Sequence, residues 1–175
     1  MPVIVDGDRI VHDSTAIADY LEERYPDWPS LFGGANGRAL TRFVQNWTET
    51  VLQAGLFRFV VLDIHRHCTP EEQAYLRRTR EEAIGATLED VRDREARLPA
   101  FRASLSPLRR TVERQDFVSG ATPAYADYVV FGAFQLARAI SDFEVIAGDD
   151  PIGAWRGRML NLFDGFARRA SAYGG

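Results

Sequence analysis

One stretch of the chain has almost no polar side when it is placed on a helical wheel. Residues 122–138 read TPAYADYVVFGAFQLAR, in which only Asp127, Gln135 and Arg138 carry a charge or an amide. A helix that is apolar all round is a buried helix. Thr122 is a good N-cap residue, and Pro123 suits the first helical position. The pattern therefore predicts a central helix that starts at Thr122 and is wrapped by the other segments.

A second, amphipathic pattern runs from residue 38 to residue 65. Its apolar stripe has helical spacing and consists of Leu40, Phe43, Val44, Trp47, Val51, Ala54 and Phe59. We expect one long helix with this stripe turned inward. Trp47 has two interpretations at this point: it lines an apolar substrate pocket, or it packs in the core.

The first thirteen residues have the pattern of a β-hairpin. Residues 3–5 and 9–11 are rich in β-branched side chains, and Asp6-Gly7 between them is a strong turn signal. The first strand would have an unpaired outer edge. A helix follows, opened by Asp13 and Ser14 and stopped by Pro26. A two-stranded hairpin is marginally stable alone and needs more strands or a helix over its face. The pattern therefore looks like a chain that enters a sheet halfway.

The remaining segments carry several helix boundary signals. Thr69-Pro70-Glu71-Glu72 starts a helix that Gly85 ends, and Thr87 starts another. Pro99 and Pro107 should divide the next stretch into two or three pieces. Asp149-Asp150-Pro151 should cap a last helix that ends near Gly165 and turns Trp155, Met159, Leu162 and Phe163 inward.

Composition narrows the function classes. The 175 residues are 46% apolar and 26% charged, which is ordinary for a globular domain. The net charge is −4, so we expect no nucleic-acid partner. All 21 basic residues are arginine, a usage typical of GC-rich bacterial genomes. Cys68 is the only cysteine, which suits a reducing cytoplasm, and no apolar run is long enough to cross a membrane.

Two polar clusters are candidate sites, one at residues 12–14 and one at residues 65–68. His12, Asp13 and Ser14 are consecutive, so their side chains diverge and cannot form a catalytic triad. His65 and His67 point to opposite faces of a helix beside Cys68, so we expect no metal site. The start of the helix at Asp13 and Ser14 could hold a carboxylate or phosphate, or the two residues could simply cap the helix.

The segment PVIVDGDRIVHDSTAIADYLEERYP resembles the closing part of the thioredoxin-like domain of glutathione transferases. The segment 122–138 resembles the core helix of the all-helical domain of that family. Three further segments, YADYVVFGAFQLAR, RRTREEAIG and DDPIGAWRGRMLNLFDG, are similar to bacterial members related to glutathione-dependent β-aryl-etherases. The resemblance covers nearly the whole chain.

The resemblance implies a mostly α-helical protein with a partial thioredoxin-like piece. Residues 1–27 would be that remnant, 28–37 a linker, and 38–175 the all-helical C-terminal domain. Pro2 would be the cis-proline of the family, and Met1 would pair its backbone with the cysteinyl part of glutathione. Asp13 and Ser14 would hold its γ-glutamyl end. The family also implies a homodimer and a small hydrophobic electrophile as second substrate.

Two departures from the family pattern stand out. Ala124 replaces the hydroxyl or amide residue that usually precedes the helix aspartate, so we expect Thr122 to cap instead and the helix to begin two residues earlier. The strand-helix-strand that carries the catalytic Ser, Tyr or Cys is absent from this sequence. No catalytic residue can therefore be assigned, and we expect weak glutathione conjugation from this chain.

Three hypotheses follow. The first is a transferase in which the glutathione thiol attacks an electrophilic, aromatic substrate, either by conjugation or by ether cleavage. The second is a non-catalytic interaction or dimerisation module with the same fold. The third is a helical ligand-binding bundle that carries an accessory hairpin.

Overall fold

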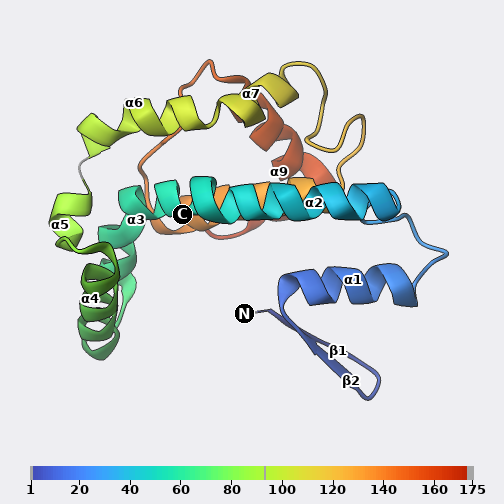
Figure 1. Cartoon of the computed structure of the whole chain (residues 1–175), viewed down its shortest axis with the longest axis horizontal. Coiled ribbons are helices and arrows are strands. Elements are labelled where there is room, and N and C mark those ends of the chain that lie inside the picture. The colour runs from blue at the N-terminus through green and yellow to red at the C-terminus, as the bar shows by residue number, and fades with distance from the viewer. Residues whose placement is uncertain (1, 93, 173–175) are drawn as a thin grey trace.

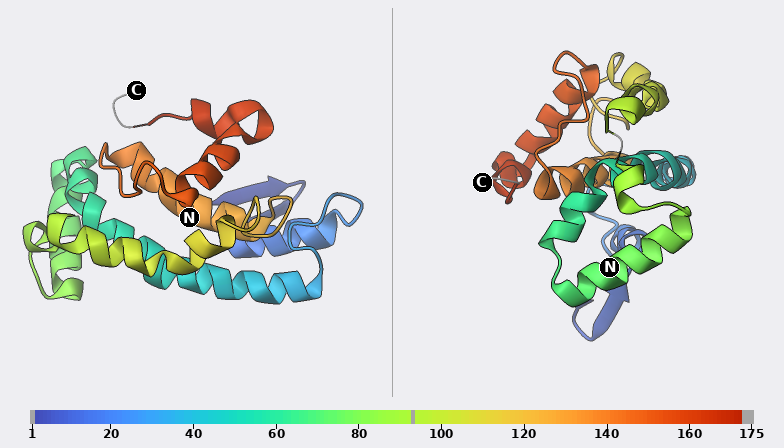
Figure 2. Two further views of the ribbon diagram at one scale, coloured as in Figure 1. Left: turned by 90° about the horizontal axis from the view of Figure 1, so that it is seen from above. Right: turned by 90° about the vertical axis from the view of Figure 1, so that its left-hand side faces the viewer.

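The computed structural model describes residues 2–92 and 94–172, and it is built mostly of helices (Figure 1). The predicted fold class, a β-hairpin and a helix followed by a helical domain of the glutathione-transferase type, is confirmed. Helix α8 lies between α2 and α9, and the hairpin with α1 sits at one side of this layer (Figure 2). The elements are β1 Val3–Asp6, β2 Arg9–His12, α1 Ser14–Arg24, α2 Ala35–Trp47, η1 Thr48–Gln53, α3 Ala54–His67, α4 Pro70–Ile84, α5 Leu88–Val91, α6 Arg94–Ser104, α7 Ser106–Val112, α8 Tyr125–Ile140 and α9 Pro151–Arg169.

The hairpin forms as predicted, with Val3 opposite His12 and Asp6 opposite Arg9. Gly7 takes φ +58° in the turn, a conformation that glycine adopts without steric cost. Within the described residues the sheet has two strands, so each strand has one edge without a neighbour. Val5 is 70% exposed and lies on the face turned away from α1.

Asp6 joins the hairpin to α1. Its carboxylate accepts hydrogen bonds from the hydroxyl groups of Tyr20 (2.8 Å) and Tyr25 (2.6 Å). These two bonds, that of Tyr25 first, lower the pKa of Asp6 because they stabilise the ionised carboxylate. The same contacts raise the pKa of each tyrosine. The turn of the hairpin is thus held against the C-terminal half of α1.

The long helix predicted for residues 38–65 exists, but it begins at Ala35 and ends at His67. Its middle is the π-helical segment η1, which has wider turns than an α-helix. A stripe drawn at constant α-helical spacing therefore slips across η1. Leu40 and Phe43, which we placed inward, are 67% and 72% exposed. Of the predicted stripe, Phe59 is buried, and Val44 and Trp47 pack half-buried against the core. The buried positions are Thr41, Thr48, Leu52, Leu56, Phe59, Val60, Val61 and Asp63.

Helix α8 forms the centre of the helical domain, but it begins at Tyr125 rather than at Thr122. The prediction that Thr122 caps the helix is wrong. The carboxylate of Asp127 accepts a hydrogen bond from the N–H of Ala124 and holds that residue at the N-cap position (3.2 Å). The helix also has a solvent side, because Leu136 is 56% exposed and Gly132 is exposed one turn before it.

The predicted helix starts at residues 69, 87 and 150 are confirmed. Thr69 and Glu72 form a capping box, Thr87 accepts a hydrogen bond from the N–H of Asp90, and Asp150 accepts one from the N–H of Ile152. Gly85 ends α4 in the left-handed conformation. Pro99 lies inside α6, while Pro107 lies in the first turn of α7.

The last helix differs from the prediction at its C-terminal end. Trp155 and Met159 are buried as expected, but Phe163 is 72% exposed and does not face inward. The regular helix stops before Leu162, because Phe163, Asp164 and Gly165 adopt left-handed conformations. One further helical turn follows them.

Candidate functional site

A cleft of about 260 Å³ lies where the start of α1 meets the helical domain. Helix α1 contributes one residue to it, α2 and η1 contribute three polar ones, and α8 contributes the rest. The lining residues are Ser14, Gln45, Glu49, Gln53, Tyr125, Tyr128, Val129, Gly132 and Ala133. The cleft therefore combines the positive end of a helix with hydrogen-bonding side chains and a partly aromatic wall.

Asp13 is the N-cap of α1. One oxygen of its carboxylate accepts hydrogen bonds from the N–H groups of Thr15 (2.9 Å) and Ala16 (3.1 Å). Its φ is +75°, an uncommon conformation for a residue with a side chain, and its own N–H bonds to the carbonyl of Pro2 (3.2 Å). This unfavourable backbone conformation presents the next residue to the cleft.

Ser14 is the residue that turns toward the cleft. Its hydroxyl has no hydrogen-bond partner among residues 2–92 and 94–172, and its side chain is exposed. Of the two interpretations left open by the sequence, capping is performed by Asp13. The hydroxyl of Ser14 stays available to an anionic group at the helix end. Its role in binding glutathione remains a prediction.

The other two predicted site residues lie at the start of the chain. Met1 is outside the described residues, and so is the peptide bond that would show whether Pro2 is cis. The carbonyl of Pro2 accepts the N–H of Asp13, so the backbone of Pro2 lies beside the start of α1.

Polar side chains connect α1 to α2 beside the cleft. The amide nitrogen of Gln45 donates hydrogen bonds to the hydroxyl of Thr15 (2.8 Å) and to the carboxylate of Glu49 (3.1 Å). Helix α1 is therefore positioned by a hydrogen bond one residue away from Ser14.

The sequence analysis missed the tyrosines of the cleft. Tyr125 packs edge-on against Phe32, with ring centroids 5.4 Å apart. Burial raises the pKa of Tyr128, and the nearby negative charge of Asp127 raises it further. The Tyr128 phenol is therefore neutral at physiological pH and can donate a hydrogen bond. The available signal was the i, i+3 spacing of these residues, which we interpreted only as a buried helix.

Trp47 lines a different hollow. Its side chain lies between α2 and α7 in an apolar groove of about 200 Å³, together with Phe43, Pro107 and Val118. It also packs against the core, as the second interpretation expected. No residue is shared between the lining of this groove and that of the cleft at Ser14.

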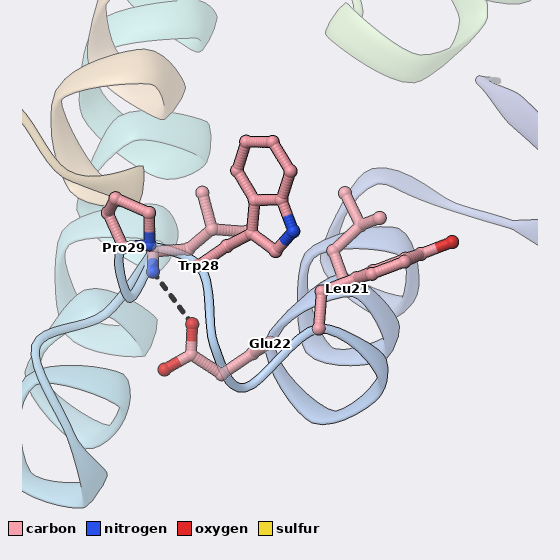
Figure 3. A pocket seen from close by; sticks show the side chains of 6 residues that line it. Leu21, Glu22, Trp28 and Pro29 are labelled. Atoms are coloured by element: carbon pink, nitrogen blue, oxygen red, sulfur yellow. Dashed lines mark hydrogen bonds between the residues drawn. The ribbon is translucent and has the colours of Figure 1, made fainter.

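A larger hollow, of about 510 Å³, opens between α1 and the segment that follows it (Figure 3). Its lining is mainly apolar and includes Leu21 and the 73% exposed ring of Trp28. The one carboxylate in it, Glu22, already accepts hydrogen bonds from the N–H of Leu31 (2.7 Å) and the hydroxyl of Ser30. Tyr25 also lines this hollow, but its hydroxyl already donates to the carboxylate of Asp6 (2.6 Å). This arrangement therefore offers mainly packing surface.

Other candidate sites do not assemble. Among the described residues no group of three His, Cys, Asp or Glu side chains could hold a metal ion. Cys68 is half-exposed at the end of α3, where its carbonyl accepts a hydrogen bond from Gln73. None of the helices that the structure describes is long and apolar enough to cross a membrane.

Comparison with known families decides the assignment. The family model "Glutathione S-transferase, C-terminal domain" matches residues 39–167, and the corresponding N-terminal domain model matches residues 1–29. The chain belongs to the glutathione S-transferase family. The two matches leave only the segment around the start of α2 between them.

Solved structures of glutathione transferases share this fold. The chain is 26% identical to glutathione transferase GSTFuA3 from Phanerochaete chrysosporium, with a TM-score of 0.66 over 94% of this chain and 65% of that one. It is also 26% identical to CsGST83044 of Ceriporiopsis subvermispora, solved in complex with glutathione, with a TM-score of 0.65 over 97% and 68%. The β-etherase LigF from Sphingobium sp. strain SYK-6 has the same fold at 22% identity, with a TM-score of 0.62 over 92% and 74%.

A curated relative matches over a shorter stretch. A zeta-class glutathione S-transferase of Euphorbia esula is 34% identical over 74 residues, which is 42% of this chain and 32% of that protein. The chain thus spans about two thirds of the structural relatives and about a third of this curated one.

Proposed function

We propose that the protein binds glutathione in the cleft at the start of α1. In this arrangement the γ-glutamyl carboxylate of glutathione would accept hydrogen bonds from the hydroxyl and the backbone N–H of Ser14. The hydroxyl of Ser14, which is exposed at a helix N-terminus and has no hydrogen-bond partner in the described part of the chain, carries this proposal. Family membership supports it, and so does the glutathione complex of the relative from Ceriporiopsis subvermispora.

The proposed reaction is transfer of the glutathionyl group, through its sulfur, to an electrophilic carbon. A carbon–sulfur bond forms, the leaving group departs with its bonding electron pair, and the thiol proton passes to solvent or to the leaving group. For an aryl ether the leaving group would be an aryloxide. The ether as substrate rests on the resemblance to β-aryl-etherases alone. The proposed setting is a reducing cytoplasm, where glutathione is kept as the thiol.

Calorimetric titration with glutathione tests the binding site. We expect Ser14→Ala to weaken binding roughly tenfold, because a hydrogen bond to a charged group is lost. Ser171→Ala serves as the matched control, since Ser171 is exposed near the end of the chain and does not line the cleft. Binding that is equally strong in both variants would show that the carboxylate lies elsewhere.

We also propose that two copies pair through the exposed part of α2. Leu40 and Phe43 lie one turn apart on this helix, and both are largely exposed. Phe43 also borders the apolar groove that contains Trp47. Large exposed apolar groups that adjoin a groove are typical of association surfaces.

Nothing in the comparisons favours the non-catalytic module over a transferase.

A further inference from the structure

Helix α9 is interrupted by three consecutive residues in the left-handed conformation. Phe163 has φ 52°, Asp164 has φ 54° and Gly165 has φ 75°. Only glycine adopts this conformation without steric cost, and runs of it are rare in residues with side chains. An unfavourable backbone conformation that persists in a folded protein commonly marks a functional position.

The consequence of this turn is the position of the Phe163 ring. Continued as a regular helix, the apolar pattern of α9 would direct Phe163 inward, as the sequence analysis expected. The left-handed turn instead leaves the side chain 72% exposed. The ring faces Tyr128 of α8, with centroids 6.5 Å apart and planes inclined by only 25°.

Tyr128 connects this turn to the cleft at Ser14. It is one of the lining residues of that cleft, and Gly132 lies one helical turn further along the same wall. A Cβ atom added at Gly132 would meet no atom within 4 Å, so the wall is open at that point. The cleft therefore has an unfilled space on α8 next to a pair of nearly parallel rings.

The segment that carries Phe163 is fixed on α8. The amide of Gln135 and the guanidinium of Arg138 both donate to the carbonyl of Ala167, at 3.4 Å each. Arg138 also donates to the carbonyl of Arg168 (3.3 Å). These bonds hold the last turn of α9 against α8, so the position of the Phe163 ring relative to Tyr128 is part of the fold.

We propose that Phe163 and Tyr128 together select substrates with a planar aromatic group, which they hold at the edge of the cleft. The inference rests on the proposed glutathione site, because that site places the sulfur in the same cleft. Rigid aromatic side chains bind a flat ring through offset stacking and lose little conformational freedom. Phe163 is a specificity-determining residue in this scheme and takes no part in bond breaking.

Two glutathione derivatives isolate the contribution of the ring. S-methylglutathione and S-benzylglutathione share the tripeptide and differ only in the group on sulfur, so the ratio of their dissociation constants reports the aromatic contact. We expect the wild-type protein to prefer the benzyl derivative. Replacing Phe163 should reduce that preference roughly three- to tenfold, the usual worth of an aromatic pair.

The variants are chosen to preserve the backbone turn. Phe163→Asn removes the ring and keeps a residue that tolerates the left-handed conformation. Phe163→Tyr retains the ring and should keep the preference. Phe166→Asn is the matched control, since Phe166 is similarly exposed at 71% but follows the turn. It should leave the ratio unchanged.

The outcomes separate the two proposals. A lower benzyl preference in Phe163→Asn alone, with glutathione affinity unchanged, supports the aromatic pair. Equal preference in all variants, with glutathione still bound, overturns the aromatic pair and leaves the glutathione site standing. Absence of binding of glutathione and both derivatives to the wild-type protein overturns the glutathione site and this inference with it.

Discussion

Asp127 joins three separate parts of the helical domain through one carboxylate. It is fully buried and accepts hydrogen bonds from the N–H groups of Val118 (2.7 Å) and Ser119 (3.1 Å) in the preceding loop. It also accepts one from the N–H of Ala124 at the helix start and one from the indole of Trp155 in α9 (3.0 Å). Such a network stabilises the fold only while every donor has its acceptor.

Replacement of Asp127 by alanine should therefore be strongly destabilising. Three backbone N–H groups and the indole N–H would lose their partner inside the protein, and we expect the free energy of unfolding to fall by roughly 3 kcal/mol. Urea unfolding followed by circular dichroism measures the change. Trp155→Phe is the comparison, because it removes one donor and leaves the other three bonds in place. A smaller loss from Asp127→Ala than from Trp155→Phe would contradict this view of the residue.

At the scale of elements, two glycines show how closely the helices pack. A Cβ atom at Gly55 in α3 would lie 2.4 Å from the ring of Phe101 in α6. A Cβ atom added at Gly132 in α8 would meet nothing from neighbouring elements within 4 Å. One glycine permits a close approach of two helices, whereas the other lies beside open space. The two therefore test packing and intrinsic helix preference separately.

The substitutions Gly55→Ala and Gly132→Ala should have opposite effects. Alanine favours helix formation over glycine by roughly 1 kcal/mol, so Gly132→Ala should raise the free energy of unfolding by up to that amount. Gly55→Ala should lower it by roughly 1–3 kcal/mol, because the Phe101 ring must move. Chemical denaturation of both variants against the wild type provides the measurement. Equal stabilisation by both would mean that α3 and α6 do not pack closely at this point.

The sequence correctly predicted helix starts that depend only on residues close by in the chain. Capping at Thr69, Thr87 and Asp150 is local chemistry, and these starts were predicted correctly. The predicted start of α8 was wrong because Asp127, which fixes the start through the N–H of Ala124, is itself held by Val118 and by Trp155 of another helix. Local propensity carries no information about such distant partners.

The same distinction applies to the cleft and its surroundings. Ser14 was found from the helix start that it shares with Asp13. The inward stripe failed at Ala54 because η1 changes the helical repeat, whereas at Phe43, which precedes η1, the stripe was drawn too wide. The outward turn of Phe163 required a conformation that its residue type disfavours. Backbone irregularities of this kind leave little trace in a hydrophobic pattern.

At the scale of the whole molecule, exposed apolar surface on α2 is the basis for the proposed dimer. We expect the wild-type protein to be a dimer at micromolar concentration and Phe43→Glu to be a monomer, because a charge would be buried in the interface. Sedimentation equilibrium distinguishes the two states. Tyr75→Glu on α4 is the control, since Tyr75 is also exposed, at 64%, but lies on another helix. A monomeric wild-type protein, or a dimer that persists in Phe43→Glu, would refute this interface.

The cleft lies between α1 and the helical domain, and charged side chains connect these two parts of the chain. Ser14 belongs to α1, whereas Tyr128 belongs to α8. Helix α1 is attached to α2 by ion pairs of Asp19 with Arg38 (3.5 Å) and Arg42 (3.3 Å), all in contact with solvent. Dissolved salt screens such pairs. Rising ionic strength should therefore weaken the proposed binding of the tripeptide well before it unfolds the helical bundle, so that ligand affinity and thermal resistance respond to the medium separately.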